Sequence, residues 1–175
     1  MPQSWNNLAA VPYVIHRSAY TISDDILGAV FQEVVDAGHI STVFHDMPMN
    51  SVDEFIKLMR NPINAPVFIF DSEACVGFAW LNGITKTSAY GHFCYLKHAT
   101  VTAMDFGQKV MQYWDALLPK QNIEVVIGVV PSFNARAGAF VQKLGFKKVG
   151  EIPRMIRNAQ TGESWAAMLF YRLTR

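Results

Sequence analysis

The stretch from Ile123 to Ile152 constrains the fold more than any other part of this 175-residue chain. It begins with IEVVIGVV, a nearly continuous apolar run that is typical of a strand buried on both faces of a sheet. A helix is expected next, ended by Gly145, and KKVGEIPRM then reads as another strand. The helical stripe is formed by Phe133, Ala137, Phe140, Val141 and Leu144. A buried strand, a helix and a further strand indicate an α/β sheet that carries helices on its faces.

Two helices are expected in the N-terminal third. The first covers about Ser23–Ala37, with Ser23 as its cap and Gly38 at its end. The second begins at Ser51, whose spacing to Glu54 is that of a capping box. A short strand around Tyr13–His16 is expected before both. Their apolar stripes are Ile26, Val30, Phe31, Val34 and Val35 in the first helix, and Phe55, Leu58 and Met59 in the second.

The middle of the chain reads as a meander of three strands followed by a helix. PVFIF and CVGFAWL are separated by the turn DSEA and predict a hairpin. Ser88–Lys97 is the third strand, and Thr102–Leu118 has the spacing of a helix that ends at Pro119. SWAAMLFYRL pairs with KKVGEIPRM at the C-terminal end. With no repeat or linker in view, the sequence predicts one domain over residues 1–175.

Composition narrows the class of protein. Hydrophobic residues make up 51% of the chain and charged residues 17%, which predicts a globular protein. The formal net charge of +1 gives no reason to expect nucleic acid or a membrane as partner. The apolar runs are too short to cross a bilayer, and MPQSWNNLAAVPYV lacks the pattern of a signal peptide. Cys75 and Cys94 form no CxxC, so buried free thiols in the cytoplasm are expected.

The C-terminal part of the chain contains a motif that recurs among the members of one protein family. The motif N-x-x-A-x-x-hydrophobic-Y-x-K-x-G-F, followed by V-G, is matched by Asn134, Ala137, Phe140, Lys143, Gly145, Phe146, Val149 and Gly150. On these residues, and on the order of elements over nearly the whole chain, the sequence resembles the GCN5-related N-acetyltransferases (GNAT). The resemblance implies an α/β fold with a mixed, mostly antiparallel central sheet and helices on both faces. It also implies that the strands 88–97 and 124–130 splay apart.

The resemblance further implies acetyl-CoA as co-substrate and no metal. Its pantetheine arm would lie in the splay, against the backbone of Phe93, Cys94, Tyr95 and Leu96 and beside the side chain of Asn134. Ala137 and Phe140 belong to the same implied site. The CoA pyrophosphate would meet the N-terminus of the helix that begins near Thr102. That loop consists of Thr102, Ala103, Met104, Asp105, Phe106 and Gly107.

Two positions depart from the family pattern. The pyrophosphate loop of the family reads Q/R-x-x-G-x-G/A, whereas this chain has Thr102 and Asp105 at the first and fourth positions. Thr102 and Asp105 have the spacing of a helix cap, which competes with a diphosphate for the same N–H donors. Val141 stands where many members have a tyrosine that protonates the departing thiolate. Tyr95 or Cys94 could take over that task, and a core role is the alternative for each.

A base that accepts the proton of the amine is also expected. His92, in the strand that would face the cofactor, is the first candidate, and His98 the second. For either one, an ordinary structural histidine is the alternative.

Two functions stay open. The first is an acetyl-CoA-dependent N-acyltransferase that acts on an amine of an unknown small molecule or protein by direct attack. The second is a catalytically eroded GNAT-fold binding or structural protein of phage or prophage origin, because similar proteins of tailed phages have comparably altered loops. A second copy of the chain, in a homodimer, is a further candidate partner.

Overall fold

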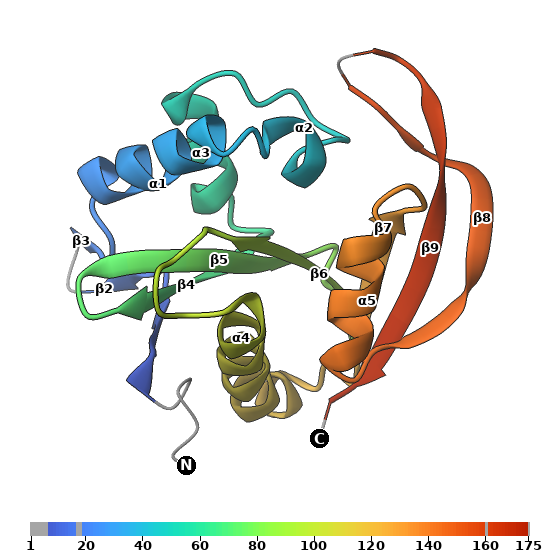
Figure 1. Ribbon diagram of the computed structural model, residues 1–175. Helices are drawn as coiled ribbons and strands as arrows, with labels where there is room; N and C mark the ends of the chain where they lie inside the picture. The colour runs from blue at the N-terminus through green and yellow to red at the C-terminus, as the bar shows by residue number, and fades with distance from the viewer. Residues whose placement is uncertain (1–6, 17–18, 160, 175) are drawn as a thin grey trace.

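A seven-stranded sheet in the order β1-β4-β5-β6-β7-β9-β8 forms the centre of the computed structural model, which describes residues 7–16, 19–159 and 161–174 (Figure 1). All neighbouring strands in it are antiparallel except β6 and β7. Its strands are β1 (Ala9–Pro12), β4 (Ala65–Asp71), β5 (Ala74–Asn82), β6 (Ser88–Tyr95), β7 (Val125–Pro131), β8 (Lys147–Arg157) and β9 (Ser164–Leu173). Two short strands, β2 (Ile15–His16) and β3 (Ala19–Tyr20), pair separately. The predicted mixed, mostly antiparallel sheet is confirmed.

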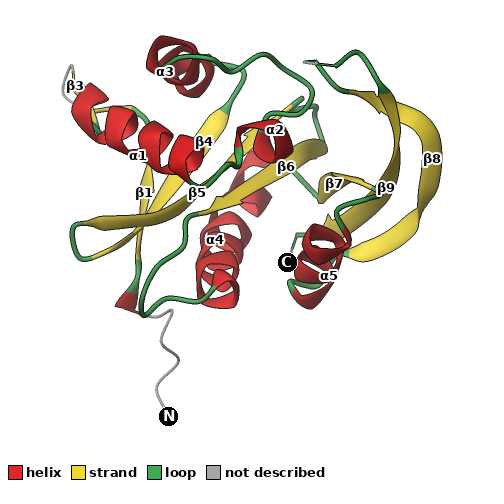
Figure 2. Cartoon of the chain, turned by 45° about the horizontal axis from the view of Figure 1, so that its top comes forward, coloured by secondary structure: helices red, strands yellow, loops and turns green. Residues whose placement is uncertain are grey.

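Helices cover both faces of the sheet. In Figure 1, α1 (Asp24–Asp36), α2 (Ile40–Val43) and α3 (Val52–Arg60) lie above the sheet, while α4 (Ala103–Leu117) lies below it. A 3₁₀ turn (Leu118–Gln121) follows α4, and α5 (Ala135–Lys143) packs into the same core as α4 (Figure 2). Successive side chains along a strand point to opposite faces of the sheet and so contribute to two separate cores. Phe68 and Phe78 face α1 and α3, while Val67 and Ala79 face α4.

Local capping signals set the helix starts. The Ser23 hydroxyl accepts from the Ile26 N–H at the start of α1, as predicted. The Ser51 hydroxyl accepts from the Glu54 N–H at 3.3 Å, but the Glu54 carboxylate accepts from the N–H of Asn50 at 2.6 Å, one residue before the expected partner. The cap of α3 therefore differs from a regular capping box in one bond: the Glu54 carboxylate binds the N–H of the residue before the N-cap.

Three expectations from the sequence differ from the structure. The short strand expected around Tyr13–His16 is present only as β2, which pairs with β3, and the first strand of the main sheet, β1, ends earlier, at Pro12. Ile26 and Val35 are 42% and 41% exposed, because α1 buries the arc centred on Leu27, Val30, Phe31 and Val34. Phe133 precedes α5, is 59% exposed and packs its ring edgewise on Trp165.

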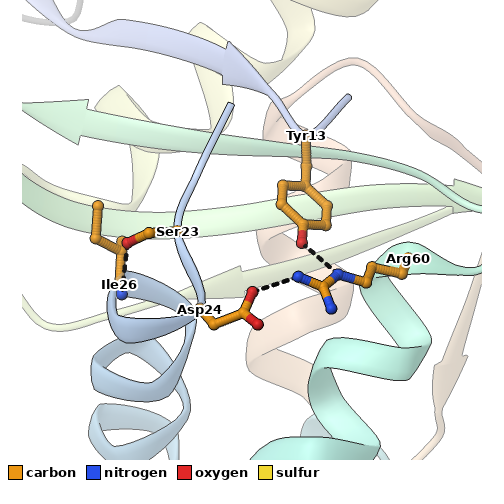
Figure 3. A network of polar contacts seen from close by, with 5 residues as sticks. All are labelled: Tyr13, Ser23, Asp24, Ile26 and Arg60. Carbon is orange, nitrogen blue, oxygen red and sulfur yellow. Dashed lines mark hydrogen bonds and ion pairs between the residues drawn. The ribbon is translucent and has the colours of Figure 1, made fainter. Parts of the chain in front are cut away.

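A polar cluster joins α1 and α3 to the start of the sheet (Figure 3). The Arg60 guanidinium, at the end of α3, donates to the Tyr13 hydroxyl at 3.1 Å and forms an ion pair with Asp24 in the first turn of α1. The same guanidinium lies 4.4 Å from the centroid of the Tyr20 ring. These contacts fix the two helices relative to each other on this face of the sheet.

The long β8–β9 hairpin extends past the end of β7 and turns back toward α2 (Figure 1). Near its tip, the Ala159 N–H donates to the carbonyl oxygen of His45 at 2.9 Å. Asn158 is buried, and its side-chain oxygen accepts from the Thr161 N–H at 2.9 Å. The hairpin therefore closes one side of the space between α2 and β7. Within the described ranges, no helix is long and apolar enough to span a membrane.

Candidate functional site

The parallel strands β6 and β7 separate soon after they meet. Residues 88–90 pair with residues 125–127, and no pairing follows, although β6 continues to Tyr95 and β7 to Pro131. The other edge of β6 stays paired with β5 as far as Tyr95. The predicted splay is confirmed, and it leaves one edge of Gly91–Tyr95 without a strand partner.

A cavity of about 430 Å³ occupies this gap. On the side of α2 its wall includes His39, Thr42, Val43 and His45. On the side of α4 and α5 its wall includes Ala103, Phe106, Asn134, Arg136, Ala137 and Phe140. Because residues from both faces line one cavity, the gap connects the two faces of the sheet. Two molecules can therefore approach a common point from opposite sides.

Most of the predicted cofactor residues lie around this cavity. Those in its wall are Phe93, Cys94, Tyr95, Ala103, Phe106, Asn134, Ala137 and Phe140. The others, which the cavity wall does not include, are Leu96, Thr102, Met104, Asp105 and Gly107. Leu96 lies beyond the end of β6, is buried in the core, and its N–H donates to the carbonyl of Val76 at 3.0 Å. Its backbone donor is thus already used by β5, which is a correction to its predicted role.

The predicted pyrophosphate loop is a closed capping box. The Asp105 carboxylate accepts from the Thr102 N–H at 3.0 Å and from the Thr102 hydroxyl at 2.7 Å. In return, the Asp105 N–H donates to the Thr102 hydroxyl at 3.1 Å. Of the four N-terminal donors that a helix leaves open, this box uses two and leaves those of Ala103 and Met104. The self-capping predicted from the sequence is confirmed.

Gly107 has a different role from the one expected. It lies inside α4, beyond the open N–H groups of its first turn, and it is buried. A Cβ atom here would come within 2.7 Å of the Phe140 ring and 2.8 Å of the Leu144 side chain. The glycine therefore allows α4 and α5 to pack closely, and its backbone does not face a phosphate.

Asn134 and Arg136 lie together at the start of α5. The Asn134 side chain caps the helix, because its oxygen accepts from the Ala137 N–H at 3.1 Å. The same residue is part of the cavity wall. Arg136 was missed by the sequence analysis, although it is in the cavity wall and is the only lysine or arginine among the described lining residues. A basic residue in the first turn after the matched asparagine was the available signal.

His92 lies in the gap, on the face of the sheet covered by α1 and α2. Its Nε2 lies 3.0 Å from the side-chain oxygen of Asn82. That oxygen is an acceptor, so the contact suits the neutral tautomer that carries its proton on Nε2 and has Nδ1 as the acceptor. Burial lowers the pKa of His92 to about 4; the nearby Asp46 charge acts in the opposite direction, and His45 lowers the pKa further. The imidazole is therefore neutral at neutral pH.

The other predicted proton carriers have structural contacts. The Tyr95 hydroxyl donates to the Val101 carbonyl at 2.6 Å and accepts from the His98 N–H at 3.3 Å, so it holds the loop that leads into α4. Burial raises the pKa of the Cys94 thiol, which is 2% exposed. His98 is absent from the cavity wall, and its side chain contacts Thr100. These findings favour the core or structural alternative for all three.

The described residues contain no group of three or more His, Cys, Asp or Glu side chains placed to hold a metal ion.

No protein-family model matches the chain, and no curated protein matches its sequence. Solved structures do match it. Spermidine N-acetyltransferase from Vibrio cholerae, in complex with CoA and spermine, is 16% identical with a TM-score of 0.72, and the match covers 97% of this chain and 96% of that chain.

Ribosomal-protein-S5-alanine acetyltransferase from Vibrio fischeri is 12% identical with a TM-score of 0.68, and the match covers 96% of this chain and 93% of that one. The fold is that of the GNAT acetyltransferases. At sequence identities of 12–16%, the similarity to these structures shows a shared fold and does not establish a shared function. The phage origin stays a prediction, since none of these findings tests it.

Proposed function

We propose that this protein is an acetyl-CoA-dependent N-acyltransferase that transfers the acetyl group to an amine by direct attack. The observation that supports this best is the cavity between β6 and β7, which is lined by residues from both faces of the sheet. A thioester carrier and an acceptor need such an arrangement, because each must reach the same carbonyl carbon from its own side.

The carrier enters from the side of α4 and α5. Its pantetheine arm lies along the unpaired edge of Gly91–Tyr95 and hydrogen-bonds to this backbone as an added strand would. The amide nitrogen of Asn134 donates to the same arm. The N–H groups of Ala103 and Met104, together with the Arg136 guanidinium, attract the phosphates. The carboxylate of Asp105 opposes them.

The acceptor enters from the side of α2. Its nitrogen attacks the thioester carbonyl carbon, while a backbone N–H on the open edge of β6 polarises the carbonyl oxygen. The new C–N bond forms as the C–S bond breaks, and the nitrogen gives its proton to Nδ1 of His92. The CoA thiolate takes a proton from water, because Val141 offers none and the hydroxyl proton of Tyr95 is bound to Val101.

A second candidate function follows from the capping box. The capping box occupies two helix donors, the N–H groups of Thr102 and Asp105, and the Asp105 carboxylate adds a negative charge where the proposed enzyme needs to bind a diphosphate. If that contact abolishes cofactor binding, the protein is an eroded GNAT-fold binding protein.

Calorimetric titration with acetyl-CoA separates the two functions. The enzyme is expected to bind acetyl-CoA with a Kd in the micromolar range or below, roughly 8 kcal/mol of binding free energy. Asn134→Ser retains a capping oxygen but loses the amide donor, so it is expected to weaken binding about tenfold with little change in Tm.

Asp105→Asn, which removes the charge at constant shape, is the companion variant, and Asp105→Gly removes the cap as well. Binding that appears in these variants but not in the wild type would favour the eroded site. Absence of binding in all of them would refute the enzyme.

A further inference from the structure

A row of stacked rings crosses three strands of the sheet and ends at the gap. Phe68 on β4 stacks on Phe78 of β5, Phe78 stacks on Trp80, and Trp80 stacks on His92 of β6. The ring centroids are 5.5, 5.9 and 4.4 Å apart, and the last pair is inclined by only 6°. The register of the strands places these rings side by side, because Phe68 pairs with Phe78 across β4 and β5, and Trp80 pairs with His92 across β5 and β6.

The row stops at His92 because β7 no longer pairs with β6 at this level. One face of the imidazole is covered by Trp80, and the residue is part of the cavity wall. The opposite face of the ring therefore points away from β5, toward the gap. A flat group that enters from the side of α2 would continue the row as its next ring.

The acceptor side of the cavity contains no carboxylate among the residues that the structure describes. Its wall there is made of His39, Thr42, Val43, His45, Trp80 and His92. Asp46 follows His45 but is exposed and is not part of the wall. An alkylammonium or a polyamine would meet no carboxylate in this wall. The charge of Asp46 acts on His92 from outside the wall but is exposed and screened by solvent, so desolvation of the cation stays costly.

We propose that the acceptor is an arylamine, an aromatic amine that is uncharged at neutral pH, with its ring stacked on the open face of His92. This inference rests on the proposed acyl transfer and names its substrate class. A benzene-sized ring fits a cavity of about 150 Å³, so the 430 Å³ present here accommodates one beside a pantetheine arm.

The chemistry of His92 agrees with such an acceptor. An arylamine nitrogen has a free lone pair at neutral pH, so no base is needed before it attacks the thioester. Once the C–N bond has formed, that nitrogen carries a positive charge and is acidic. Nδ1 of His92 is a weak base, since the pKa is about 4, and it suffices for this proton but not for an alkylammonium.

The test measures amine binding without acetyl-CoA and turnover with it. The probes are 4-methoxyaniline, the aliphatic cation cyclohexylamine as a control of similar size, and spermidine. Calorimetry is expected to detect binding of 4-methoxyaniline but not of the two controls. In turnover, followed by release of the CoA thiol, kcat/KM is expected to be at least tenfold higher for 4-methoxyaniline than for either control. Equal or higher values for cyclohexylamine or spermidine would overturn the inference, as would absence of arylamine binding.

Two variants separate stacking from proton transfer. His92→Phe retains a flat ring and is expected to keep the affinity for 4-methoxyaniline while kcat falls. His92→Leu removes the ring and is expected to weaken that affinity about tenfold. Both should retain the affinity for acetyl-CoA, which shows that they are folded. Unchanged arylamine affinity in His92→Leu contradicts the stack, whereas loss of acetyl-CoA binding by the wild type contradicts only the proposed acyl transfer.

Discussion

Acid should destabilise this protein between pH 6.5 and about pH 4, because of His92. The folded protein holds the pKa of His92 at about 4, compared with an ordinary value of 6.5. Between these two values the unfolded chain binds a proton that the folded chain does not, so stability is lost as pH falls from 6.5 toward 4. For these pKa values the free energy of unfolding drops by about 2 kcal/mol from pH 7 to pH 5, and by about 3 kcal/mol from pH 7 to pH 4.

Urea denaturation at pH 7 and pH 5, followed by tryptophan fluorescence, measures this difference. His92→Gln retains a polar side chain that does not titrate, so we expect its loss of stability between the two pH values to be smaller than that of the wild type by about 2 kcal/mol. His98→Gln is the matched control, since it removes an imidazole from the loop after β6, outside the cavity wall, and leaves His92 in place.

The same pH dependence in His92→Gln and the wild type would refute the argument. It would mean that the imidazole is protonated equally well in the folded and the unfolded chain. The burial of His92 and its contact with Trp80 would then not control its charge.

Two further predictions concern packing, and both are read from urea denaturation at pH 7. Asp115→Ala leaves the buried Arg172 without the carboxylate that it contacts at 2.6 and 2.7 Å, and should cost about 3 kcal/mol, at the low end for a buried pair because the Asp115 side chain is 26% exposed. A loss below about 1 kcal/mol would contradict the burial of Arg172. Gly107→Ala forces a methyl group against Phe140 and Leu144 and should cost about 1–3 kcal/mol, whereas a stabilised variant would show that α4 and α5 are packed less closely than described.

Much of the fold was predictable from short stretches of sequence. Ser23 and the pair Thr102 and Asp105 cap their helices as expected, because such a cap involves residues only three apart. The alternating and helical apolar patterns placed most of the remaining elements within a few residues of their true ends. The details that failed, such as the exposure of Ile26, depend on which part of an apolar arc faces a neighbour.

The candidate site was predictable only in part. Asn134 and His92 lie at the cavity as expected, because the motif and the strand that carry them are local features. The short helix α2, which lies between His39 and His45, was not expected, because four residues are too few for an apolar period. The roles of Tyr95 and Gly107 changed because their partners, Val101 for one and Phe140 for the other, are set by the path of a loop and by helix packing.

The sequence alone therefore determined the order of the longer helices and of the strands from β4 to β9, the helix caps and the closure of the loop before α4, since these depend on residues a few positions apart. Only the tertiary structure decided that β6 and β7 part after three pairs, that a cavity connects the two faces there, and that the stacked row ends at His92. Strands more than 30 positions apart meet or separate according to the packing of every layer around them, and no local pattern records that balance.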